Sequence, residues 1–233
     1  MKTKGLIFVF FVCILFQACG KKSAADFNSD FSLFKEYIVS FTGGIVSAQS
    51  DIRVVLAFDN NNWKVNEVLD DDLFDISPSV NGKVVALSNN TIAFIPEKKL
   101  ESNTEYQVTL HLDKLNPKVA EKDKGLSNFN FTVKTIKQDF VVNTLDVQSY
   151  SKEYQYLNCV LKTADNIDFE TAKKLIEAKH NGNDLNIVFE KSNSGGKEFK
   201  FRIDSIQRVD IASNLEIEYD GNDYDIDQKG TID

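Results

Sequence analysis

The most constraining feature of this sequence is an alternation of apolar and polar residues that starts near residue 37 and recurs along the chain. Every second side chain is apolar, which is typical of a β-strand with one buried face. The β-rich runs of this region are residues 52–57, 84–87, 91–95, 106–112 and 129–134. Five or six short strands separated by turn residues predict an all-β sandwich.

A second unit begins near residue 139, with a strand that ends near Thr163. The pattern then changes over Asp165 to Lys179, where apolar residues recur at helical spacing. Asp168 can cap the start of this helix, and Asn181-Gly182 can end it. Strands resume at residues 185–189, 199–203 and 215–219. These features predict a smaller β-sandwich with one short helical insert.

The first 18 residues have the pattern of a secretory signal peptide. Two lysines precede an apolar run from Leu6 to Phe16. At about 1.5 Å per residue, a helix of this length reaches roughly halfway across a bilayer core. The next segment, Leu15 to Gly20, resembles the lipobox of bacterial lipoproteins, in which the chain is cut before a cysteine that then carries lipid. We predict a signal peptide over 1–18 and lipid attachment at Cys19, with an ordinary signal peptide and an incidental cysteine as the alternative.

The segment 19–37 is polar and mixed, without a sustained period, which predicts a tether between the lipid and the first sandwich. The two sandwich modules are then expected over 38–138 and 139–233. Acyl chains on Cys19 would hold the protein on a membrane without a spanning helix. We predict a place in the cell envelope, on the periplasmic face, with the cell surface as the alternative.

Composition disfavours several classes of partner. The net charge of −8 and pI near 4.9 describe an acidic protein that repels phosphate backbones, so no nucleic-acid partner is predicted. Two His and three Cys leave little material for a zinc site or a disulfide framework, and neither metal nor cofactor is predicted. Cys159 lies in an apolar run and is predicted to be a buried small hydrophobe rather than a reactive thiol.

Two acidic clusters have both a structural and a ligand-binding interpretation. Asp223, Asp225 and Asp227 alternate as in a calcium loop, but Gln228 stands where the EF-hand pattern needs glycine. The solvent face of a strand is the preferred interpretation, with calcium as the alternative. Asp70-Asp71-Asp72 predicts a surface turn, with a cation site as the alternative.

The remaining candidates are weaker. The segment Ser194 to Lys197 has part of a phosphate-loop pattern but lacks the upstream glycine, and it predicts a hairpin turn. His111 and His180 are predicted to be surface residues without a catalytic role. Trp63 is predicted to be a packed loop anchor, with an exposed sugar- or partner-binding aromatic as the alternative. A pair of carboxylates brought together by folding remains open.

One succession of segments is more specific than periodicity. The segments are Ile76–Val84, Asn90–Leu100, Asn103–Leu110 and Phe129–Thr135. This succession resembles a bacterial Ig-like domain and, more narrowly, the amino-terminal segment of the lipoprotein α2-macroglobulins of the Bacteroidetes type. The later segments Ile136–Phe140, Thr163-Ala164-Asp165 and Glu216–Gly221 resemble the second module of that family. The resemblance covers about residues 38–233 and implies two consecutive Ig-like or macroglobulin-type β-sandwich modules.

Within the expected first module, several residues have physical roles that fit such a fold. Gly82 and the pair Asn89-Asn90 are expected to turn the hairpin, where asparagine tolerates positive φ. Pro96 is expected to end an edge strand. Tyr106 is expected to anchor a strand after the Asn103-Thr104 turn.

The family consists of large anchored proteins proposed to trap proteases after cleavage of a bait segment, in many members with a Cys-Gly-Glu-Gln thioester. This chain contains no such tetrapeptide, so it is expected to be a fragment or a short relative. The resemblance implies a non-enzymatic scaffold segment of an endopeptidase inhibitor, with the membrane, proteases or neighbouring macroglobulin modules as partners. The alternatives are a stand-alone envelope lipoprotein that binds carbohydrate or protein, and a hydrolase with unrecognised carboxylates.

Overall fold

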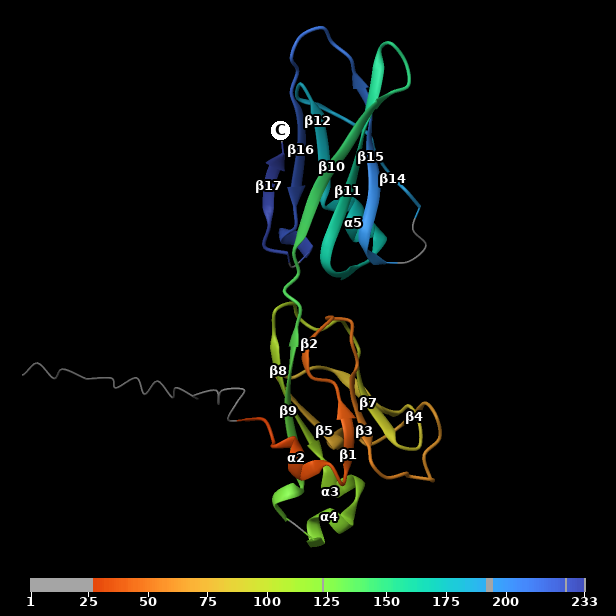
Figure 1. The fold of residues 1–233 in the computed structure, drawn as a ribbon, viewed down its shortest axis with the longest axis vertical. Coiled ribbons are helices and arrows are strands. Elements are labelled where there is room, and N and C mark those ends of the chain that lie inside the picture. The colour runs from red at the N-terminus through yellow and green to blue at the C-terminus, as the bar shows by residue number, and fades with distance from the viewer. Residues whose placement is uncertain (1–26, 123, 192–194, 225, 233) are drawn as a thin grey trace, which may run out of the picture.

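The computed structural model describes residues 27–122, 124–191, 195–224 and 226–232. Two β-rich units follow one another along the long axis of the molecule (Figure 1). The first module contains strands β1 to β9, and the second contains β10 to β17. The predicted signal peptide and Cys19 lie outside the described residues. No helix among the described residues is both long and apolar enough to cross a membrane.

The first module is built from two sheets. One sheet has the order β1-β3-β7-β6-β4, with bounds Ile38–Phe41, Ile52–Leu56, Thr91–Pro96, Gly82–Ala86 and Glu67–Val68. The other has the order β2-β9-β8-β5, with bounds Gly44–Val46, Asn128–Thr135, Glu105–His111 and Phe74–Ser77. The short helices are α2 (Phe31–Phe34), η1 (Asp71–Leu73), α3 (Leu112–Leu115), α4 (Pro117–Lys122) and η2 (Lys124–Leu126).

The arrangement of these strands is that of an immunoglobulin-like sandwich. The first strand is divided between the sheets, since β1 pairs antiparallel with β3 whereas β2 pairs parallel with β9. The orders β3-β7-β6 and β9-β8-β5 match the BED and GFC parts of the two sheets of such domains, and the two-residue strand β4 is an addition at the edge beyond β6. Alternation along β3, β8 and β9 places one face of each strand in the core, as predicted. The predicted all-β fold class is confirmed.

The tether prediction is wrong for the part of residues 19–37 that the structure describes. Phe34 is 3% exposed and packs in the core of the first module, with Phe31 and Tyr37 beside it. Ser29 donates its backbone N–H to the carbonyl of Asn130 in β9 at 2.8 Å. The sequence pattern missed this because the apolar residues Phe31, Leu33, Phe34 and Tyr37 span only one short stretch among polar neighbours, which is too short to establish a sustained period.

The second module is also a two-sheet sandwich. One sheet has the order β10-β11-β15-β14, with bounds Phe140–Ser149, Tyr154–Ile167, Gly196–Gln207 and Ile187–Phe189. The other has the order β13-β12-β16-β17, with bounds Asn183–Asp184, Ile176–His180, Leu215–Asp220 and Lys229–Ile232. The remaining elements are α5 (Phe169–Lys174) and η3 (Asn222–Tyr224). A separate apolar cluster, running from Phe140 to Ile226, fills the space between these sheets.

The predicted helix over 165–179 is confirmed only in its middle. Asp168 caps α5 by accepting the Thr171 backbone N–H at 2.8 Å, as expected. The helix ends at Lys174, and the following residues form strand β12 with every second side chain buried. Asn181 and Gly182, with φ of 50° and 78°, turn a β-hairpin rather than end a helix. Pairing of β12 with β16 overrides the local helical spacing.

The hairpin of β6 and β7 is confirmed, but two of its residues act differently from the prediction. Gly82 lies at the open end of the hairpin, opposite Pro96, rather than in the turn. A side chain at Gly82 would collide with the Phe94 ring and the Ile95 carbonyl, so glycine is needed there for close approach. Pro96 ends β7, which lies inside the sheet rather than at its edge.

Candidate functional site

The most organised polar site of the described chain lies at the joint between the two modules, around Asp165. This residue, near the end of β11, is 2% exposed. Its Oδ2 accepts the Ala48 backbone N–H at 2.7 Å and the Ser47 hydroxyl at 3.0 Å. Its Oδ1 accepts the Asn166 backbone N–H at 2.8 Å. A carboxylate of the second module is therefore held by the β2–β3 loop of the first.

Gln138, in the segment between β9 and β10, forms two hydrogen bonds with the backbone of Asp165. Its Oε1 accepts the Asp165 N–H at 2.8 Å, and its Nε2 donates to the Asp165 carbonyl at 3.0 Å. The Gln138 N–H in turn donates to the Ser102 hydroxyl at 2.7 Å, in the β7–β8 loop of the first module. The linker is thus tied by hydrogen bonds to both modules.

A third link between the modules comes from Gln49, whose Nε2 donates to the Asn166 carbonyl at 3.2 Å.

An open cavity of about 800 Å³ runs along this joint, between the end loops of the two modules. Its lining is mixed, with apolar Leu100 and Ile136 beside acidic Asp168 and Asp223. Buried polar groups are costly unless hydrogen-bonded, and the donors around Asp165 meet that need. The joint has the features of a fixed connection.

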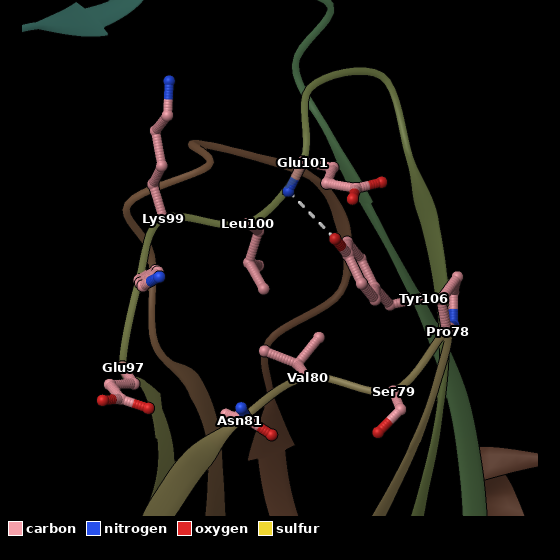
Figure 2. A pocket seen from close by; sticks show the side chains of 10 residues that line it. Pro78, Ser79, Val80, Asn81, Glu97, Lys99, Leu100, Glu101 and Tyr106 are labelled. Carbon is pink, nitrogen blue, oxygen red and sulfur yellow. Dashed lines mark hydrogen bonds between the residues drawn. The ribbon is translucent and has the colours of Figure 1, made fainter.

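A second cavity, of about 510 Å³, lies on the same end of the first module (Figure 2). Two loops line it, Pro78–Asn81 and Glu97–Glu101, and Tyr106 lies beside them. The Tyr106 hydroxyl accepts the Glu101 backbone N–H at 3.0 Å, and the residue is 2% exposed. This is the tyrosine corner of immunoglobulin-like domains. The predicted anchoring role of Tyr106 after the Asn103 turn, where φ is 53°, is confirmed.

Replacing Tyr106 with phenylalanine is expected to lower the free energy of unfolding of the first module by about 1 kcal/mol, since the Glu101 N–H loses its acceptor. Trp63, the single tryptophan, packs against the first core, so its fluorescence in a urea titration follows this module. Ser79→Ala, an exposed change on the same cavity, is the control and should stay within about 0.5 kcal/mol. Equal free energies of unfolding for Tyr106→Phe and the wild type would show that the Tyr106 hydrogen bond contributes nothing to the stability of the first module.

Cys159 has the environment predicted for a structural residue. It is 1% exposed within the second core, and burial raises the pKa of its thiol to about 12. Cys19, the predicted lipid-attachment residue, lies outside the described residues and has no structural account.

The two histidines are separate and differ in exposure. His111 contacts Asn128 Oδ1 and Asp75 Oδ2, both at 2.8 Å, at the surface of the first module. His180 is 7% exposed on β12 and lies 2.9 Å from the Ser213 hydroxyl, so its predicted surface position is wrong. Its burial follows from the alternation of β12, which the sequence pattern assigned to a helix.

The acidic clusters are also dispersed. The turn at Asp70-Asp71-Asp72 is confirmed, and the Lys114 ammonium pairs with Asp72 Oδ2 at 2.7 Å. The segment from Asp223 forms a short 3-10 turn followed by buried Ile226, so its interpretation as a strand face is wrong, while Asp225 lies outside the described residues. Within the described ranges, no group of three or more His, Cys, Asp or Glu side chains is placed to hold a metal ion.

Two further predictions concern loops. Trp63 is partly buried against the first core, which confirms its role as a packed anchor. Of the predicted turn over Ser194 to Lys197, Gly196 and Lys197 are the first residues of β15, Gly195 lies just before that strand, and Ser194 lies outside the described residues.

No protein-family model matches this chain, and no curated protein matches it. Solved structures that are similar include L,D-transpeptidase 3 from Mycobacterium tuberculosis in complex with a faropenem-derived adduct, at 12% identity and a TM-score of 0.30 over 53% of this chain. An L,D-transpeptidase from M. tuberculosis H37Rv is 10% identical, with a TM-score of 0.30 over 66% of this chain. The match covers 46% and 59% of those two chains. Likeness at this level supports no argument about function.

Proposed function

We propose that this chain is a non-enzymatic scaffold: the amino-terminal, membrane-anchored segment of an α2-macroglobulin-like endopeptidase inhibitor. The observation that supports it most is the joint around Asp165, where side chains and backbone of both modules are hydrogen-bonded to one another. A scaffold segment works by holding rigid surfaces at a set spacing, and such a joint provides that spacing. The assignment to the α2-macroglobulin family rests on the sequence resemblance of the two modules, in this order, and on the lipobox-like segment that precedes them.

The position of the first described residues fits an anchored spacer. Helix α2 lies in the half of the first module that faces away from the second module (Figure 1). A lipid on Cys19 is only a short segment away from Asn28 and Ser29, which are fastened to β9. An anchor there would place the first module nearest the membrane and carry the second module outward.

Replacing Cys19 with serine is expected to move the protein from the membrane fraction to the soluble fraction, because no acyl chain can then be attached. The measurement is fractionation of cells that express the full chain, followed by detection of the protein in each fraction. Cys13→Ser, within the apolar run of the signal peptide, is the matched control and should leave the protein in the membrane fraction. Unchanged partitioning of Cys19→Ser would remove the lipid anchor from the proposal.

The inhibitor part of the proposal is tested by the genomic DNA beyond codon 233. A reading frame that continues into further β-modules with a bait region supports an α2-macroglobulin-like protein. An immediate stop codon would contradict it and leave the stand-alone binding lipoprotein as the better account.

A further inference from the structure

The β10–β11 hairpin lies at the end of the second module away from the first (Figure 1). Three tyrosines form an ordered cluster at this hairpin. The Tyr150 ring is stacked with Tyr154 at a centroid distance of 6.5 Å and with Tyr156 at 5.9 Å. Tyr150 and Tyr154 are 54% and 40% exposed. The Arg202 guanidinium lies over the Tyr156 ring, 5.3 Å from its centroid. Large rings held this way by their neighbours lose little conformational entropy on binding a ligand.

Beside these rings, three polar side chains are fixed on the same outer face of the sheet. The Asp146 carboxylate accepts hydrogen bonds from Gln148 Nε2 and from Asn158 Nδ2, and these bonds hold its pKa below the ordinary value. Gln148 Oε1 also accepts the Tyr156 hydroxyl at 2.7 Å, which joins this polar group to the ring cluster. Asn158 pairs across the strands with both Asp146 and Arg202, so all of these residues form one continuous surface.

This polar group keeps hydrogen-bonding capacity that its internal bonds do not use. Asp146 accepts two hydrogen bonds in the described structure, although a carboxylate offers about four acceptor sites. Gln148 and Asn158 each donate one of two amide hydrogens to Asp146. The surface therefore offers both acceptors and donors next to aromatic rings.

We propose that this tyrosine platform, comprising Tyr150, Tyr154, Tyr156, Arg202, Asp146, Gln148 and Asn158, binds a neutral polysaccharide chain. Sugar rings present apolar faces that can lie against tyrosines, and hydroxyls that both donate and accept hydrogen bonds, which matches this surface. A proline-rich peptide would offer few donors to Asp146, so it fits less well. None of the cavities described above includes these residues, and a shallow face suits a polymer lying along it better than an enclosed small molecule.

Affinity gel electrophoresis of the purified Cys19→Ser chain tests the proposal, with soluble β-glucan, xylan, mannan and amylopectin as the probes. At least one polysaccharide is expected to retard migration of the protein. Tyr150→Ala, which removes the central ring of the stack, is expected to weaken that retardation about tenfold. Asp146→Asn keeps the shape but removes an acceptor and the charge, and a loss of about threefold or more is expected.

Ile45→Ala, a 71% exposed apolar residue on the first module, is the control and should migrate like wild type. Thermal unfolding of each variant should remain cooperative, which separates loss of binding from loss of folding. Absence of retardation with all four polysaccharides would overturn the proposal. Retardation that is unchanged in both platform variants would also overturn it. Self-association of the wild type that Tyr150→Ala abolishes would likewise overturn it, because this face would then be a protein contact. The proposed scaffold role is independent of each of these results.

Discussion

Replacing Asp165 with alanine is expected to uncouple the two modules. The substitution leaves the Ala48 and Asn166 N–H groups without their acceptor and removes the partner of the Ser47 hydroxyl. Leaving such groups unsatisfied costs about 1–3 kcal/mol each when they stay buried, so the joint should open and let water reach them. Small-angle scattering of the variant should require an ensemble of module orientations, whereas one orientation should fit the wild type.

Asp168→Ala is the matched control for this experiment. It removes the cap of α5, which costs about 1 kcal/mol, but it removes none of the hydrogen bonds that cross the joint. Its scattering curve should match that of the wild type. Asp165→Asn should have an intermediate effect, because an amide oxygen in the place of Oδ2 can still accept from both Ala48 and Ser47, while the amide nitrogen in the place of Oδ1 cannot accept the Asn166 N–H. If Asp165→Ala also scattered as a single rigid particle, the joint would not depend on this carboxylate.

Replacing Phe34 with alanine is expected to lower the free energy of unfolding of the first module by about 3–5 kcal/mol, the usual cost of removing a buried phenylalanine. Phe34 is 3% exposed, and its ring lies 5.0 Å from that of Phe129, measured between centroids. A urea titration followed by Trp63 fluorescence measures this change. The result distinguishes an integrated segment from a free tether, in which the same substitution would have no effect.

Leu33→Ala is the control, because this neighbouring apolar residue is 60% exposed. Its free energy of unfolding should stay within about 0.5 kcal/mol of the wild type. Similar losses for both variants would mean that α2 contributes through helix formation rather than through the ring of Phe34. No loss for either would restore the tether interpretation of this segment.

Strand alternation was the part of the fold that sequence could predict. Along β3, Ile52, Val54 and Leu56 are all fully buried while Arg53 is exposed, because one face of a sandwich sheet contacts the core. The same pattern failed at β12, where only Ile176, Ala178 and His180 alternate and helical spacing extends across their start. Both strands have five residues, but Ile176 of β12 also continues the helical spacing of Phe169, Ala172 and Leu175, so the local pattern favours a helix there.

The joint could not be predicted for a different reason. Asp165 lies 117 residues along the chain from Ala48, and nothing in the local sequence marks this acid as buried. The only sequence feature that involves Asp165 is the resemblance of Thr163-Ala164-Asp165 to part of the second family module, and it indicates a place in the fold but no hydrogen-bond partner.

The tyrosine platform could not be predicted from the sequence either, because the rings of Tyr150 and Tyr156 meet only once the hairpin has formed.

The central claim is that the two modules are held in one orientation, and a distance measurement between them tests it most directly. Spin labels on Val39→Cys in the first module and Val188→Cys in the second, both exposed, can be introduced into the chain that carries both Cys13→Ser and Cys19→Ser. Buried Cys159, whose thiol has a pKa raised to about 12, should stay unlabelled. Pulsed electron–electron double resonance is expected to give one narrow distance distribution, which broadens in Asp165→Ala. A broad distribution in the chain with Asp165 intact would contradict the account.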